Sequence, residues 1–145
     1  MKNDKIAILI KKTALVVEKI SNRMLVPYDL THTQFKILMM LYRNRDKEIR
    51  QADIEADFSM TNPTVTGIIQ NLEKKNLVRR VANPKDKRSK VLVLTERAYQ
   101  MEPEMKELAK QRESQITKNL TEEECDLLAD LLKKILENGN DERKQ

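Results

Sequence analysis

Apolar residues recur at helical spacing over much of the chain. In residues 4–26 the stripe consists of Ile6, Leu9, Ile10, Thr13, Val16, Val17, Ile20 and Met24, which predicts a helix that Pro27 ends. Residues 31–44 predict a second helix, in which Thr31 and Gln34 form a capping box and Phe35, Leu38, Met39 and Tyr42 make the buried face. A short third helix fits residues 51–58, with Ala52 or Ile54 and Phe58 facing inward.

A fourth helix is predicted to begin at Pro63, the first helical position, with Asn62 before it as a good N-cap residue. Its inward stripe is Val65, Ile68, Ile69 and Leu72, which leaves small and hydrogen-bonding residues near or on the outer face. After Asn76 the pattern becomes β-rich in residues 77–82 and 90–94, and residues 83–89 have the composition of an exposed turn. This pattern predicts a β-hairpin.

Two further helices are expected in the last third of the chain. A long helix from about Thr95 uses Ala98, Met101, Met105, Leu108 and Ile116, and Pro103 lies inside it, where proline can kink a helix. Thr121 and Glu124 cap a final helix with the stripe Leu128, Leu131, Leu132, Ile135 and Leu136. We expect Gly139 to close this helix. The fold class is therefore mainly α with a small β-hairpin.

Composition narrows the class of protein. The chain has 145 residues, two glycines and 3% aromatic residues, as expected for one helical domain. Its apolar runs fall short of the roughly 18 residues of a membrane-spanning helix, and it lacks a signal-peptide pattern. A single cysteine, Cys125, excludes an intrachain disulfide. We therefore expect a cytoplasmic protein without a membrane partner.

Charge is concentrated in one block. The formal net charge is +5, yet eight positive residues lie between Lys74 and Lys90, against the acidic Glu73 and Asp86. A solvated face explains such a block as well as a nucleic-acid surface does.

The order of the parts favours the second explanation. Three helices followed at once by a basic hairpin, the wing, are the order of a winged helix-turn-helix, whose last helix enters the major groove of DNA while the wing reaches the backbone or minor groove. The predicted DNA contacts are Asn62, Pro63, Thr64, Thr66, Gly67, Gln70, Asn71, Lys74, Arg80, Lys85, Asp86, Lys87 and Arg88.

Residues 62–98 also carry a family resemblance. The segment resembles the recognition helix and wing of MarR-type transcriptional regulators. The matching positions are Thr64, Val65, Leu72, Glu73, Arg80, Asp86, Arg88, Leu94 and Thr95. The chain departs from that pattern at Asn76 and Ala98, where glycine is usual, and at Arg50, Glu55 and Ser59. The resemblance implies a dimeric regulator that a small ligand often releases from DNA. It also implies that Asp86 orients Arg88 toward the minor groove, although the two could form an ordinary solvated ion pair.

The terminal helices predict a homodimer. A first helix of about 22 residues spans roughly 33 Å, too long for a small winged helix to cover. Packing of the first, fifth and sixth helices within one chain could bury some of its stripe, but a two-fold dimer built from the terminal helices is the simpler explanation. The predicted interface is Ile6, Leu9, Ile10, Val16, Leu128, Leu131, Leu132 and Ile135. The resemblance implies a small aromatic or lipophilic effector in a site lined by Met24, Tyr28, Phe35, Met39 and Tyr42, although Met and aromatic residues at helical spacing are usually plain core.

Other classes of function find little support. Ser/His/Asp, Cys/His and metal-ligand spacings are not evident, so we expect neither an enzyme nor a metal or cofactor. Cys125 is expected to be a structural or incidental thiol rather than a redox sensor. Residues 1–145 should form one domain, with a winged-helix lobe at about 31–95 and dimerisation helices at about 1–30 and 96–140. The predicted function is sequence-specific binding of a palindromic double-stranded operator by a ligand-responsive repressor. The alternative is a winged-helix module that binds protein through the same surface.

Overall fold

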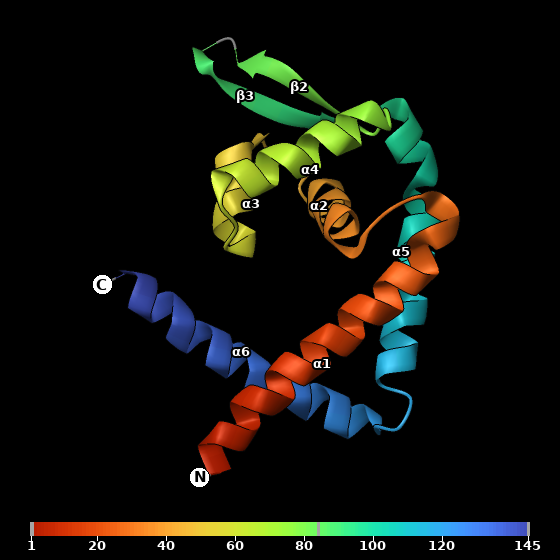
Figure 1. Ribbon diagram of the computed structural model, residues 1–145, viewed down its shortest axis with the longest axis vertical. Helices are drawn as coiled ribbons and strands as arrows, with labels where there is room; N and C mark the ends of the chain where they lie inside the picture. Colours follow the sequence, from red (N-terminus) through yellow and green to blue (C-terminus); the bar gives the residue numbers. More distant parts are fainter. Residues whose placement is uncertain (1, 84, 145) are drawn as a thin grey trace. The chain divides into compact units, whose positions relative to one another are not determined.

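The computed structural model describes residues 2–83 and 85–144, with side chains described at 5–83, 85, 86 and 90–139. The elements in chain order are α1 (Lys2–Leu25), a short 3-10 helix (Val26–Tyr28), α2 (His32–Arg43), β1 (Ile49–Arg50), α3 (Gln51–Phe58), α4 (Asn62–Lys74), β2 (Val78–Asn83), β3 (Asp86–Leu94), α5 (Glu96–Ile116) and α6 (Glu122–Lys144) (Figure 1). The chain divides into two compact units, residues 1–110 and 111–145.

The core of the first unit lies where α2, α3 and α4 meet the sheet. Its fully buried side chains include Ile37 and Leu38 of α2, Ile54 of α3 and Ile69 of α4. The predicted capping box of α2 is present, because Gln34 N–H donates to Thr31 Oγ1 at 3.2 Å and Thr31 N–H donates to Gln34 Oε1 at 3.1 Å. Met39, predicted on the buried face of α2, is only partly buried.

The third helix is where predicted, and the residues considered for its inward face differ in burial. Ile54 is fully buried, Phe58 is partly buried and Ala52 is exposed. Ser59 ends the helix in the left-handed conformation, with φ at 52°. Asn76 takes the same conformation after α4, with φ at 58°, which asparagine tolerates in a position where glycine is usual.

The start of α4 is one residue earlier than predicted. Thr61, not Asn62, is the N-cap residue: its backbone is extended, with φ −76° and ψ 157°, and its carbonyl accepts Val65 N–H at 3.1 Å. The Thr61 hydroxyl donates to the Thr64 hydroxyl at 2.9 Å. Asn62 is therefore the first helical residue and Pro63 the second, where proline is equally tolerated because the first turn lacks intrahelical N–H partners.

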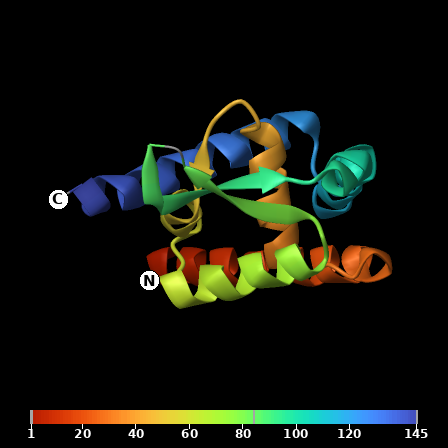
Figure 2. The ribbon, with the colours of Figure 1, turned by 90° about the horizontal axis from the view of Figure 1, so that it is seen from above.

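Within the described residues, the sheet has three antiparallel strands in the order β1-β3-β2, one strand more than predicted. β2 and β3 run side by side, with α4 next to them (Figure 2). The predicted turn at residues 83–89 is too long, because β2 extends to Asn83 and β3 begins at Asp86. Asn83 Oδ1 accepts Lys85 N–H at 3.0 Å, a local bond that tightens the turn.

The last two helices largely follow the sequence pattern. α5 contains Pro103, and its Ala98 and Met105 are fully buried. The second predicted capping box is present, with Glu124 N–H donating to Thr121 Oγ1 at 3.1 Å and Thr121 N–H donating to Glu124 Oε1 at 2.9 Å. Gly139 does not close α6, which continues to Lys144. Glycine permits the left-handed conformation of a C-cap without requiring it, and Gly139 does not adopt it.

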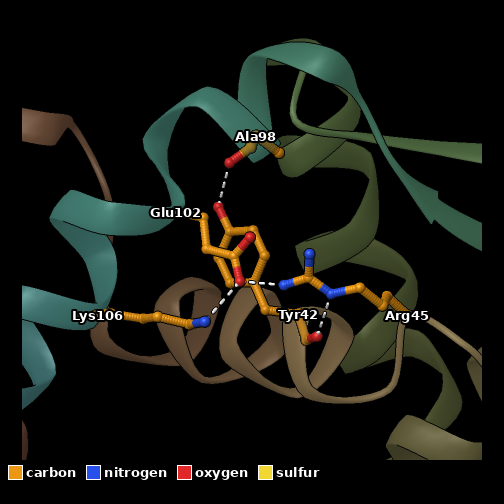
Figure 3. Close-up of polar contacts among 5 residues, drawn as sticks. All are labelled: Tyr42, Arg45, Ala98, Glu102 and Lys106. Carbon is orange, nitrogen blue, oxygen red and sulfur yellow. Dashed lines mark hydrogen bonds and ion pairs between the residues drawn. The ribbon is translucent and has the colours of Figure 1, made fainter.

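A polar joint fastens α2 and its following loop to the start of α5 (Figure 3). The Tyr42 hydroxyl donates to the Ala98 carbonyl, and Arg45 forms an ion pair with Glu102. Lys106 Nζ lies 2.9 Å from Glu102 Oε2. Burial first, and then the charge of Glu102, raises the pKa of Tyr42 to about 12. The hydrogen bond from Lys106 and then that from Arg45 lower the pKa of Glu102.

Candidate nucleic-acid interface

The outer face of α4 presents the polar side chains that the sequence placed there. Thr64, Gln70, Asn71 and Lys74 are exposed, and so are Asn62 and Pro63 at the start of the helix; Thr66 and Gly67 are half-buried. The opposite face holds Val65, Ile69 and Leu72, all fully buried. Because the apolar stripe fixes the rotation of α4 on the core, the polar side chains must face solvent.

Two residues of α3 form hydrogen bonds with the first turns of α4. Gln51 Nε2 donates to Thr66 Oγ1 at 2.8 Å and to the Asn62 carbonyl at 3.4 Å. Asn62 Nδ2 donates to Glu55 Oε2 at 3.2 Å. Sequence reasoning did not select Gln51 or Glu55, although their i, i+4 spacing already put them on one face of α3. The sequence of the turn between α3 and α4 does not indicate that this face of α3 contacts α4.

Basic side chains surround the corner between α3 and α4. Arg50, Arg80 and Lys90 line a hollow between α3, α4 and the sheet, which we call the α3–α4 hollow; its other lining residues are Gln51, Ala52, Glu55, Asn62, Thr66 and Leu92. Arg50 and Lys90 were not among the predicted contacts. Since neither lies on α4, the position of both depends on how the sheet packs.

The predicted basic contacts differ in their surroundings. Arg80 is half-buried and paired with Glu73, at 2.8 Å from Nη2 to Oε1, so it joins β2 to the end of α4. Lys74 and Lys85 are exposed, as is Asp86 at the start of β3. The side chains of Lys87 and Arg88 lie outside the described residues, so the predicted pairing of Asp86 with Arg88 remains a prediction.

Neighbouring lysines at the end of α4 have different roles. Lys75 Nζ donates to the Asp29 carbonyl and to Gln34 Oε1, the latter at 3.0 Å. It therefore holds the end of α4 on the start of α2, whereas Lys74 remains exposed beside it.

The predicted effector residues lie at the margin of the core or within it. Phe35 and Tyr42 are each 2% exposed, and both belong to the core. Tyr28 and Met39 are half-buried against it, and Met24 is half-buried on α1. A hydrogen bond with Glu104 raises the pKa of Tyr28.

Neither a metal-ligand cluster nor a membrane-spanning helix is found among the described residues. No three His, Cys, Asp or Glu side chains there are placed to hold a metal ion. Among the described helices, none combines the length and the apolar character needed to cross a membrane. Cys125 is half-buried near the start of α6.

Three helices, of which the last exposes a polar face, are followed by a hairpin that pairs with a short strand before α3. This arrangement defines a winged helix-turn-helix lobe. A model of the MarR family matches residues 30–90. The multiple antibiotic resistance protein MarR of Escherichia coli K12 is 31% identical over 120 residues, which are 82% of each chain. The chain belongs to the MarR family.

Solved structures agree over nearly the whole length. A MarR transcriptional regulator from Methanosarcina mazei Go1 superposes with a TM-score of 0.86 at 25% identity, covering 95% of this chain and 98% of that one. A cysteine-to-serine variant of E. coli MarR in complex with operator DNA gives a TM-score of 0.82 at 28% identity, covering 91% of this chain and 94% of that one.

Proposed function

We propose that the protein is a transcriptional regulator that binds double-stranded DNA sequence-specifically and acts as a repressor. The observation that carries this proposal is the exposed polar face of α4 beside a wing and a hollow lined with cations. A helix with this face can place side chains against base edges while the cations contact phosphates. The complex of E. coli MarR with operator DNA, seen for a relative of the same fold, supports it. The proposal includes a cytoplasmic location and does not include an enzymatic activity.

Within this proposal the predicted contacts divide into two groups. Gln70 and Asn71, exposed on α4, are placed to contact base edges, together with Asn62, Thr64 and Thr66 nearer its start. Lys74, Lys85, Lys87 and Arg88 supply charge to the phosphates or the minor groove. Pro63 and Gly67 allow the backbone of α4 to approach the DNA closely. Arg80 serves mainly to hold the wing against α4 through Glu73.

The proposed active form is a homodimer built from the terminal helices. On α1, Ile6, Leu9, Ile10 and Val16 are 37% to 61% exposed in the single chain, and on α6, Leu128, Leu131, Leu132 and Ile135 are 38% to 47% exposed. Apolar surface of this extent on two helices favours burial against a second copy. A two-fold dimer would present two α4 helices to a palindromic site, with half-site centres about 10 to 10.5 base pairs apart.

A small lipophilic or aromatic effector completes the proposal. Met24, Tyr28 and Met39 are the half-buried members of the predicted set, so they can change partner at lower cost than Phe35 and Tyr42. An effector acts only as far as it binds two dimer conformations differently. Phenolic and cationic lipophiles should then lower the affinity for DNA. If a broad panel of them leaves the operator complex unchanged, regulation by such compounds is refuted.

The test is a titration of labelled duplexes from the region upstream of the protein's own gene, followed by fluorescence anisotropy. Binding that survives excess scrambled duplex supports the proposal. Equal affinity for both duplexes contradicts it and favours a module that binds protein. Gln70→Ala should weaken operator binding by about 1–3 kcal/mol and leave binding to scrambled DNA nearly unchanged.

A second arm of the titration separates charge from base contacts. Arg88→Ala should weaken binding to both duplexes and make the slope of log K against log salt shallower by roughly one unit per half-site. Lys11→Ala, which removes an exposed charge from α1, is the matched control and should leave the slope unchanged. An unchanged slope for Arg88→Ala would show that the wing does not contact DNA.

A further inference from the structure

The corner between α3 and α4 contains a carboxylate in a surface otherwise suited to DNA. Glu55 is the only acidic residue among the described residues that line the α3–α4 hollow, where Arg50, Arg80 and Lys90 supply positive charge. It is also one of the positions at which the chain departs from the family pattern. A carboxylate repels phosphate, so its presence requires a reason other than attraction to the DNA backbone.

Among the described side chains, Glu55 forms no ion pair with the cations of the hollow. Its hydrogen-bond partner is the amide of Asn62, at 3.2 Å, and Arg80 pairs instead with Glu73, which does not line the hollow. The second carboxylate oxygen of Glu55 therefore keeps its capacity to accept a hydrogen bond. Glu55 is half-buried, so this capacity lies at the surface of the hollow.

The same contacts orient two neighbouring amides. A carboxylate only accepts hydrogen bonds, so Asn62 must turn its Nδ2 toward Glu55, which leaves Oδ1 as the oxygen it can present elsewhere. Gln51 uses Nε2 for both the Thr66 hydroxyl and the Asn62 carbonyl, and the latter can only accept. Its Oε1 is then the atom left for an outside donor. The corner thus presents three acceptor groups.

We propose, on the basis of the DNA-binding function proposed above, that Glu55 is a specificity-determining residue that selects an exocyclic amino group at one position of each half-site. In the major groove only cytosine N4 and adenine N6 offer such donors, whereas guanine O6 and N7 and thymine O4 are acceptors. A carboxylate pairs best with cytosine N4, so cytosine is preferred, adenine is second, and guanine and thymine are rejected by repulsion between acceptors.

A purely structural role for Glu55 makes a different prediction. If the carboxylate served only to hold Asn62 at the start of α4, its removal would weaken binding to every duplex by a similar factor. The base preference would then keep its shape. The readout that separates the two roles is therefore the pattern of affinities across bases, not the affinity for one site.

The experiment uses duplexes that the wild-type protein selects from a random pool. Every base pair of the best site is changed in turn, and affinities are measured by competition for wild type, Glu55→Gln, Glu55→Ala and the control Glu48→Gln. Glu48 is an exposed acid in the loop before β1 and does not line the α3–α4 hollow. At one position per half-site, exchanging C·G for G·C should weaken wild-type binding roughly 10- to 100-fold.

The two Glu55 variants should reduce that ratio to within about threefold and leave intact the ratios at positions that neither Glu55 nor its partner Asn62 contacts. They should also bind scrambled DNA more tightly than wild type because a repulsive charge is gone. The Glu48→Gln profile should match wild type. Profiles of the Glu55 variants parallel to wild type at every position would overturn the inference and leave the DNA-binding function standing. A wild-type protein that selects no sequence would instead overturn the proposed function, and this inference with it.

Discussion

The bond between Tyr42 and Ala98 offers a sharp test of how the winged-helix lobe is attached to α5. Tyr42 is 2% exposed and Ala98 is fully buried, and the tyrosine hydroxyl donates to the alanine carbonyl across the joint. Tyr42→Phe removes this hydroxyl and changes little else. Ala98 lies in the first turn of α5, so its carbonyl can still accept an intrahelical N–H.

The expected cost follows from this geometry. A buried hydrogen bond contributes about 0.5–1.5 kcal/mol, and leaving a carbonyl incompletely satisfied costs somewhat more. We therefore expect Tyr42→Phe to lower the free energy of unfolding by about 1–2 kcal/mol, measured by urea denaturation at fixed protein concentration with an unchanged slope. Tyr99→Phe is the matched control, because its ring lies 6.4 Å from that of Tyr42 but is 39% exposed. It should change stability by less than about 0.5 kcal/mol.

The pH dependence supplies a second measurement. Burial raises the pKa of Tyr42 to about 12, above the ordinary value of 10.0, so its stabilising contribution is complete below pH 10. It is lost as the pH rises toward 12, because the unfolded chain ionises first. The difference between wild type and Tyr42→Phe should therefore be constant near neutral pH and shrink above pH 10. Equal stabilities of Tyr42→Phe and Tyr99→Phe at pH 7 would refute a stabilising role for this hydrogen bond.

Four other substitutions have expected outcomes. Lys106 contributes most to the lowered pKa of Glu102, which therefore adds stability above its unfolded pKa near 4.5. This stability is lost as the pH falls through the lower folded pKa. Glu102→Gln should flatten the acid limb of a plot of stability against pH, and an unchanged limb would contradict this. Leu131→Asp should halve the mass measured by light scattering, because it places a charge in the proposed dimer interface; a dimer of normal affinity would exclude that interface. Ser59→Gly should raise the free energy of unfolding by roughly 0.5–1 kcal/mol by relieving the left-handed backbone at φ 52°, and Asn76→Gly should raise it less because asparagine tolerates this conformation.

Features that depend on neighbours in sequence could be predicted from the sequence. Both capping boxes, Thr31 with Gln34 and Thr121 with Glu124, form as expected because their partners are three residues apart and meet whenever the helix forms. The left-handed Asn76 follows from the same local chemistry. The buried and exposed faces of α4 followed from the periodicity of its apolar residues.

Features that depend on distant partners could not. β1 has two residues and no periodic signal, and it exists because Ile49 and Arg50 pair with Leu92 and Val91, more than forty residues away. Local propensity alone placed the N-cap at Asn62, but the Asn62 side chain is directed to Glu55 while Thr61 occupies the cap.

The candidate site divides in the same way. Periodicity identified which residues of α4 face outward, since burial of Val65, Ile69 and Leu72 sets the rotation of the helix. Only the tertiary structure brought Gln51 and Glu55 against its first turns and directed Arg80 to Glu73 rather than to solvent. The physical reason is that helical periodicity acts within one element, whereas hydrogen bonds and ion pairs between elements depend on how the core packs them together.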